Sequence, residues 1–230
     1  MPALIAVDAG TTGVRAFAVD GEGQPCGFAY RELTQYFPRP GWVEHDPEEI
    51  WTAVQTTLAE LAGRLAGDGI PVAAVGITNQ RETVVAWDRR TGRPLHRALV
   101  WQDRRTADRC DALREAGAEP GVRAATGLVL DPYFSATKME WLLSEGGIDR
   151  ANANLALGTV DAWVAWNLTG GPDGGVFATD PSNASRTMLY DIRSLSWSGE
   201  LCDLFGVPLA ALPEVRPSSG RVGLCDPARA

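Results

Sequence analysis

The chain opens with short apolar runs that are separated by glycine-containing turns. Three such runs, Leu4–Val7, Val14–Val19 and Phe28–Leu33, have the length and the β-branched or aromatic content of strands. Glycines lie between successive runs, where a tight turn needs them. The pattern predicts three consecutive antiparallel strands.

An amphipathic segment follows these strands. Asp46 suits the N-cap of a helix and Pro47 suits its first position, and apolar side chains then recur at helical spacing as far as Leu65. Two further apolar runs, Val72–Thr78 and Thr83–Trp87, predict strands.

The rest of the chain alternates between apolar stripes and glycine-rich or proline-rich connections. Helical spacing predicts helices at Thr106–Ala116, Ser135–Ser144 and Thr159–Leu168. Thr169–Gly175 is rich in glycine and predicts a surface loop, and Leu201–Phe205 is a short amphipathic stretch. Three strands, a helix and then alternating strands and helices predict an α/β domain with a mixed sheet.

Composition and charge narrow the class of protein. The 230 residues are 45% hydrophobic and carry a formal net charge of -8, which argues against nucleic acid or a membrane surface as a general partner. No apolar run approaches the roughly 20 residues that span a bilayer, and the N-terminus shows no secretory pattern. Four scattered cysteines predict reduced thiols, and two histidines argue against a zinc centre. A cytoplasmic protein is expected.

The first turn carries an unusual set of polar residues. Asp8 ends the first apolar run, Gly10-Thr11-Thr12-Gly13 forms the turn, and Arg15 follows. The glycines permit a close approach of the backbone, and turn N–H groups with the two hydroxyls can donate to phosphate oxygens. A carboxylate at this place can hold Mg²⁺. The alternative is a plain hairpin with a polar turn.

Three later stretches also place polar or aromatic side chains next to apolar runs. Arg81 and Glu82 lie between two predicted strands and suit a polyol, or they form a solvated ion-paired turn. Trp101, in Trp-Gln-Asp-Arg-Arg, lines a ligand or belongs to the core, and the arginines after it are structural or face a phosphate. Tyr133, in Asp-Pro-Tyr-Phe-Ser, presents a hydroxyl to a cleft or packs.

Taken together, these stretches resemble the glycerol kinases, within the sugar and polyol kinases that share an actin-like (ribonuclease H-like) fold. The resemblance extends to about Ser219 and implies a mixed sheet with helices on both faces. The segments that carry it are Asp8–Arg15, Pro40–Pro47, Gly76–Thr83, Val100–Thr106, Thr126–Thr137, Gly158–Gly170 and Asn183–Leu189.

The resemblance implies transfer of the γ-phosphoryl group of ATP to a terminal hydroxyl of glycerol, with Mg²⁺, to give glycerol 3-phosphate. Carried over by motif, residues of the first turn would bind the nucleotide phosphates, and residues of the later stretches would bind the glycerol hydroxyls. Asp8 organises the metal, and Trp101 lines the apolar side of the pocket. The implied phosphate-binding residues are Thr11, Thr12, Gly13 and Arg15, and those for glycerol are Arg81, Glu82 and Tyr133.

The chain departs from the family pattern in two ways. Glycerol kinases usually carry a serine where this chain has Gly13, so one hydroxyl contact to phosphate is absent. Family members are also about twice as long, with a second actin-like domain that holds adenine and ribose and supplies the general base from a Gly-Asp-Gln run. We therefore expect residues 1–219 to form the N-terminal actin-like domain and residues 220–230 to be a linker or a truncated end, with the base beyond Ala230.

Alone, such a chain is expected to be nearly inactive, and its partners are glycerol, ATP or ADP, and the missing domain. Glycerol kinases commonly form dimers or tetramers, so a homo-oligomer is also implied. Two alternatives remain open, a non-catalytic polyol-binding fragment and a kinase for another polyol or sugar.

Overall fold

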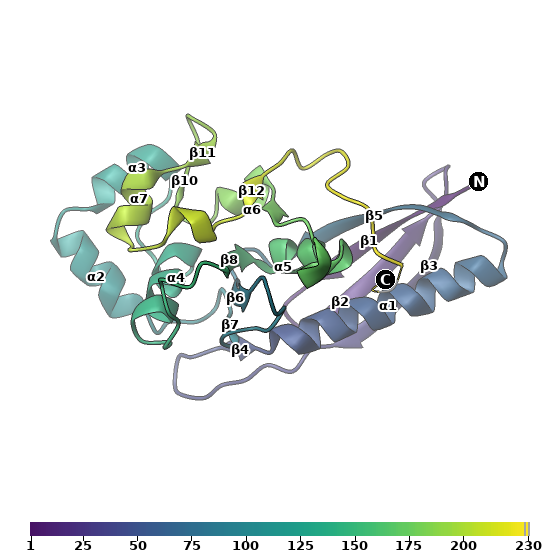
Figure 1. Ribbon diagram of the computed structural model, residues 1–230, viewed down its shortest axis with the longest axis horizontal. Coiled ribbons are helices and arrows are strands. Elements are labelled where there is room, and N and C mark those ends of the chain that lie inside the picture. Colours follow the sequence, from purple (N-terminus) through teal and green to yellow (C-terminus); the bar gives the residue numbers. More distant parts are fainter. Residues whose placement is uncertain (228, 230) are drawn as a thin grey trace.

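The computed structural model describes residues 1–227 and residue 229. Figure 1 shows one sheet and a long helix at one end of the molecule, a second sheet in the middle and a group of shorter helices at the other end. The fold is α/β and actin-like, as expected from the resemblance.

The first sheet is mixed, with strand order β3-β2-β1-β5. Strands β1 (Ala3–Ala9), β2 (Gly13–Val19) and β3 (Pro25–Glu32) pair antiparallel in succession, whereas β5 (Val72–Asn79) pairs parallel with β1. The three predicted opening strands and their hairpins are confirmed.

Helices α1 (Pro47–Gly67) and α5 (Val160–Leu168) cover one face of this sheet. The side chain of Asp46 caps α1 by accepting from the N–H of Glu48 at 2.9 Å, and Pro47 is the first helical residue, as predicted. On the opposite face Leu4, Phe28 and Tyr30 are exposed.

The second sheet is antiparallel, with strand order β4-β7-β6-β8, and it is buried on both faces. Its strands are β4 (Glu44–His45), β7 (Ala98–Leu99), β6 (Val84–Asp88) and β8 (Leu155–Thr159). Val85 and Trp87 of β6 join the core shared with α1 and α5, while Val84 and Ala86 face the core around α4 (Ser135–Ser144). Helices therefore lie on both faces of this sheet rather than of the mixed one.

The remaining elements lie around the second sheet and at its far end (Figure 1). They are α2 (Ala107–Glu115), α3 (Glu119–Thr126), η1 (Gly171–Asp173), β9 (Ala178–Thr179), α6 (Pro181–Ala184), β10 (Tyr190–Asp191), β11 (Ser196–Trp197), α7 (Gly199–Leu204), η2 (Leu209–Ala211) and β12 (Glu214–Val215).

Several elements of the fold, among them β8 and α3, were not predicted. Strand β8 was not predicted, because its apolar run leads directly into α5. The helix predicted from Thr159 overlaps the strand only at Thr159, the last residue of β8. Helix α3 contains Pro120 and Gly121, which argue against a helix on sequence grounds. Proline is nevertheless tolerated in the first helical turn, and here it occupies that turn.

The segment expected to be a linker or truncated end, residues 220–230, is described except at positions 228 and 230, which lie outside the described residues. Its backbone returns to the body of the molecule, because the N–H of Asp226 donates to the carbonyl of Leu168 at 2.8 Å. The Gln55 side chain of α1 donates to the carbonyl of Arg229 at 3.1 Å.

Candidate functional site

The turn between β1 and β2 forms a narrow backbone hairpin. The N–H of Gly10 donates to the carbonyl of Gly13 at 3.0 Å, and a Cβ on Gly10 would lie 3.2 Å from that same oxygen and 3.8 Å from Asp8 Oδ1. The carboxylate of Asp8 is exposed beside the turn, and it lies opposite Arg15 in the register of β1 and β2. Thr12 is also exposed. The polar groups of the turn are therefore accessible to a ligand.

Gln80, at the end of β5, ties this hairpin to the second sheet. Its backbone N–H donates to the carbonyl of Ala9 at 2.9 Å, and its side-chain Nε2 donates to the carbonyl of Gly10 at 3.0 Å. The same Nε2 lies 3.1 Å from Nδ1 of His45, and its Oε1 accepts from the Thr83 hydroxyl at 2.9 Å. These four contacts hold the hairpin against the Gln80–Thr83 turn.

His45 is neutral in this arrangement. Because Gln80 Nε2 donates to His45 Nδ1, the imidazole proton is on Nε2, which has no partner among residues 1–227 and 229. Burial lowers the pKa of His45 from 6.5 to about 4, although the nearby Glu49 carboxylate acts in the opposite direction.

Trp101 joins the hairpin to the other predicted ligand residues. Its indole Nε1 donates to the Thr11 hydroxyl at 2.9 Å, and its backbone N–H donates to the Thr83 hydroxyl at 3.1 Å. The edge of its ring meets Tyr133 at 5.5 Å between centroids. Trp101 is half-buried. It packs against neighbouring side chains and also borders the candidate site, so it combines the core role and the ligand-lining role considered for it.

Glu82 and Tyr133 meet at Arg186, which the sequence analysis did not assign to the site. Arg186 Nε donates to Glu82 Oε1 at 2.7 Å, and its guanidinium carbon lies 5.8 Å from the Tyr133 ring centroid and 4.8 Å from that of Phe134. The side chain of Glu82 is 3% exposed. Glu82 also has a φ of 64°, a left-handed conformation that is uncommon for a residue other than glycine. Such backbone strain is concentrated at functional sites.

Lys138 fixes the backbone that carries Tyr133. Its Nζ donates to the carbonyls of Pro132, Tyr133 and Phe134 at 2.8, 2.8 and 2.7 Å. All three ammonium protons are thereby used, and the side chain is fully buried in the first turn of α4. Burial lowers the pKa of Lys138 to about 7, against nearby carboxylates, of which Asp103 acts most strongly.

The arginines after Trp101 have different environments. Arg105 is buried between the rings of Trp42 and Trp141 and pairs with Asp103 and Glu44, each at 2.8 Å, so its role is structural. Arg104 is exposed and lies 3.3 Å from Asp131.

Arg81 is separate from the Glu82–Tyr133–Arg186 cluster. Its side chain is exposed, and within residues 1–227 and 229 no hydrogen bond or ion pair holds it. It borders a cavity of about 830 Å³ that runs along the free edge of β5. The cavity is also lined by α5, β9 and residues 217–225, and it meets the predicted site at Thr78–Arg81.

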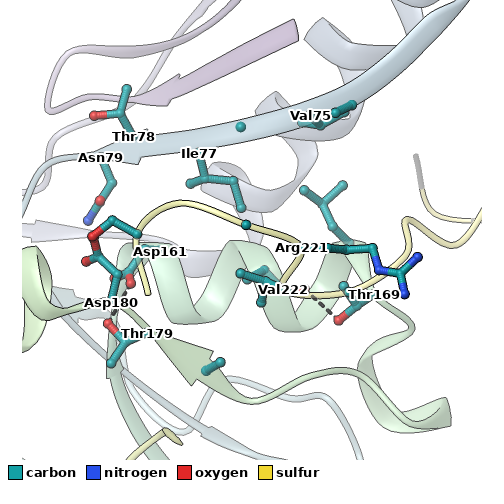
Figure 2. Close-up of a pocket in the computed structure, with 18 of the residues that line it drawn as sticks. Val75, Ile77, Thr78, Asn79, Asp161, Thr169, Thr179, Asp180, Arg221 and Val222 are labelled. Atoms are coloured by element: carbon teal, nitrogen blue, oxygen red, sulfur yellow. Dashed lines mark hydrogen bonds between the residues drawn. The ribbon is translucent and has the colours of Figure 1, made fainter. Parts of the chain in front are cut away.

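Two aspartates line this cavity (Figure 2). Figure 2 shows Asn79 pointing from β5 toward Asp161 and Asp180. Asp161 accepts from the hydroxyls of Thr159 and Thr179 at 2.5 and 2.6 Å, and burial raises its pKa to about 6. Among the described residues, no group of three or more His, Cys, Asp or Glu side chains could hold a metal ion.

The structure brings several predicted site residues together. Thr11, Trp101, Tyr133 and Glu82 form a continuous series of contacts through Arg186, whereas Asp8, Thr12 and Arg15 lie exposed at the hairpin. The sequence analysis did not assign Gln80 or Lys138. Gln80 belongs to the Gly76–Thr83 motif that carries the resemblance, but it was given no role there.

Comparisons with known proteins identify the family of the chain. Residues 3–230 match the FGGY family of carbohydrate kinases, N-terminal domain. The chain is 52% identical over 223 residues to a glycerol kinase of Paraburkholderia xenovorans, covering 96% of this chain and 44% of that protein.

Solved structures show the same fold. A Plasmodium falciparum glycerol kinase with ADP matches with a TM-score of 0.93 at 31% identity. The match covers 100% of this chain and 46% of the Plasmodium chain. A xylulose kinase from Rhodospirillum rubrum, at 24% identity, has a TM-score of 0.89 and shares the fold. The chain spans somewhat less than half the length of these relatives.

No helix within residues 1–227 and 229 is both long and apolar enough to cross a membrane. The chain belongs to the FGGY family of carbohydrate kinases, and the match is to the N-terminal domain of that family.

Proposed function

We propose that this chain carries the glycerol-binding and phosphate-binding part of an ATP-dependent glycerol kinase, which converts glycerol to glycerol 3-phosphate. The observation that carries the proposal is the Trp101 bridge. One indole donates to Thr11 in the hairpin and meets Tyr133 in the polar cluster, so the two half-sites are one side chain apart. Phosphoryl transfer depends mainly on positioning the acceptor hydroxyl against the phosphate. Relatives about 50% identical are glycerol kinases, which supports glycerol as the acceptor.

In this proposal Arg81, Glu82 and Tyr133 hold the glycerol hydroxyls. Glu82 Oε1 is engaged by Arg186, and Oε2 remains able to accept a hydroxyl proton. Arg81 is free to turn toward a ligand because no partner among the described residues holds its guanidinium. Trp101 forms the apolar wall against the carbon chain. Discrimination of a small triol relies on such paired polar groups, since an unpaired one is costly.

The hairpin would take the nucleotide phosphates. Thr11 accepts a hydrogen bond from Trp101 and keeps its own hydroxyl proton for a phosphate oxygen. Thr12 and Arg15 are exposed and can donate to the same anion, and the backbone of Gly13 lines the turn.

Asp8 fits the role of a magnesium ligand. Its carboxylate is exposed beside the hairpin, and the missing Cβ of Gly10 leaves space next to Oδ1. Mg²⁺ is commonly bound through one or two carboxylates together with substrate phosphates. When bound, the ion would neutralise charge on the phosphates, while Asp8 holds it at the hairpin.

The remaining parts of the proposal rest on the family resemblance. They are an N-terminal actin-like domain at residues 1–219, a second domain as its partner, a homo-oligomer and a cytoplasmic location. A Gly-Asp-Gln run, which would carry the general base, does not occur among these 230 residues.

Calorimetric titration of the chain with glycerol tests the polyol site. We expect saturable binding that Arg81→Ala abolishes or weakens at least tenfold, as loss of a hydrogen bond from a charged donor predicts. Because Arg81 is exposed and unpaired, the variant should fold normally. Arg123→Ala, at another exposed arginine, is the matched control. No heat from the unchanged chain would contradict a preformed polyol site.

The same titration with xylulose and sorbitol separates glycerol from other substrates. Tighter binding of either compound than of glycerol would favour a kinase for another polyol or sugar.

A further inference from the structure

The side chain of Tyr30 occupies the space next to Gly13. A Cβ built on Gly13 would lie 2.5 Å from Tyr30 Cζ, closer still to the Tyr30 hydroxyl oxygen, and 2.6 Å from the carbonyl oxygen of Arg31. These distances are far below ordinary van der Waals contact, so a side chain at position 13 and the present position of Tyr30 exclude each other. The phenol oxygen thus lies where a side chain of residue 13 would begin.

Tyr30 reaches this place from β3, across the open face of the first sheet. It is paired with Arg15 in the register of β2 and β3, and the Arg15 guanidinium carbon lies 5.8 Å from its ring centroid. Tyr30 is 37% exposed, and Thr12 and Arg15 beside it are exposed as well.

The hydroxyl of Tyr30 is only loosely engaged in the structure. It donates to the carbonyl of Thr12 at 3.3 Å, which is long for an O–H···O hydrogen bond. That carbonyl also accepts from the N–H of Leu33 at 3.0 Å. The phenol can therefore turn to another acceptor without leaving the Thr12 carbonyl unpaired.

We propose that Tyr30 is a phosphate-binding residue of the hairpin, whose hydroxyl donates to an oxygen of a bound polyphosphate in place of a side chain at position 13. The inference rests on the proposed function, since it takes the hairpin as the phosphate site. Glycerol kinases usually carry a serine hydroxyl where this chain has Gly13 in β2, and here the hydroxyl of Tyr30 in β3 would take its place. The rigid ring places the donor, and the adjacent Arg15 adds positive charge at the same point.

The test uses the 230-residue chain, with magnesium tripolyphosphate as the probe and calorimetry as the readout. Tyr30→Phe removes the hydroxyl and keeps the ring, and we expect it to weaken binding about tenfold, as one hydrogen bond to a charged oxygen predicts. Thr12→Ala is the comparison variant, because its exposed hydroxyl belongs to the hairpin in any case. Melting temperatures of both variants should stay within a few degrees of the parent chain.

A second substitution of Tyr30 separates binding from packing. Tyr30→Ala removes the ring together with the hydroxyl, and we expect it to lose about as much affinity as Tyr30→Phe, because the hydroxyl is the group that binds. If Tyr30 only packs against the hairpin, Tyr30→Phe keeps the parent affinity and Tyr30→Ala alone loses it.

The outcomes distinguish the two proposals. Unchanged binding by Tyr30→Phe, with weaker binding by Thr12→Ala, would overturn the role of Tyr30 and leave the hairpin as the phosphate site. A chain that binds no tripolyphosphate, or variants that are both indistinguishable from the parent, would refute the phosphate site and the role of Tyr30 with it.

Discussion

Acidification should destabilise the folded chain through His45, the buried imidazole that accepts a hydrogen bond from Gln80. The folded pKa of His45 is about 4, against 6.5 for the unperturbed group, because burial disfavours the charged ring. Between these two values the unfolded chain holds a proton that the folded chain lacks. Stability due to this group is therefore complete above pH 6.5 and is lost as the pH falls toward 4.

The size of the loss follows from the two pKa values. The gap between 6.5 and about 4 corresponds to about 3 kcal/mol of unfolding free energy, at about 1.4 kcal/mol per pH unit. This is a large fraction of the stability of an ordinary domain. Protonation of Nδ1 would also remove the acceptor of one hydrogen bond of Gln80, the side chain that helps to hold the Gly10–Gly13 hairpin.

His45→Asn isolates this contribution, since the amide oxygen of asparagine can accept from Gln80 but does not titrate. Urea denaturation of the parent chain and the variant at pH 4.5, 5.5, 6.5 and 7.5 gives the difference in stability at each pH. We expect the parent to lose about 1.4 kcal/mol per pH unit relative to the variant between pH 6 and 4.5. Parallel curves for the two proteins would refute the assignment of a buried neutral histidine.

Two further predictions concern buried charged groups. Burial raises the pKa of Asp161 from 3.8 to about 6, so the folded chain loses stability as the pH rises through that window. Asp161→Asn should therefore be more stable than the parent by up to about 3 kcal/mol at pH 7. If urea denaturation gives the same difference in unfolding free energy between variant and parent at pH 4 and pH 7, the prediction is contradicted. Lys138→Met should cost about 3 kcal/mol, because three carbonyls lose their donor inside the protein. Ser144→Ala, at the exposed end of the same helix, is the control, and its unfolding free energy should stay within about 0.5 kcal/mol of the parent in the same urea measurement. If Lys138→Met costs no more than this control, the Lys138 contacts contribute little.

The parts of the fold that the sequence predicted are those with long local patterns. The apolar runs on either side of Gly10–Gly13 predicted the first hairpin, and Asp46-Pro47 with the apolar stripe after it predicted α1. Two-residue strands such as β4 and β7 have no local period, because only their neighbours across the sheet define them. Strand β8 was hidden for another reason, since an apolar run buried on both faces cannot be told from the start of a buried helix.

The candidate site divides in the same way. Thr11, Glu82 and Tyr133 were predicted because motifs of a few residues mark them. Arg186 was quoted as part of a motif without a role, because its contact with Glu82 spans 104 residues of sequence. Lys138 gave no polar signal that distinguishes it from a surface lysine on α4, and only the packed structure shows it to be buried.

Two bridges, made by Gln80 and Trp101, attach the hairpin to the part of the chain that carries the Glu82–Tyr133–Arg186 cluster. Gln80 holds the Gly10 carbonyl, and Trp101 holds the Thr11 hydroxyl. Both bridges converge on Thr83, whose hydroxyl donates to Gln80 and accepts from the backbone N–H of Trp101. A shift of the Gln80–Thr83 turn would therefore move the proposed phosphate-binding and polyol-binding groups together. Since phosphoryl transfer requires a fixed distance between the acceptor hydroxyl and the phosphate, a shared anchor preserves that distance where two separate loops would let it vary.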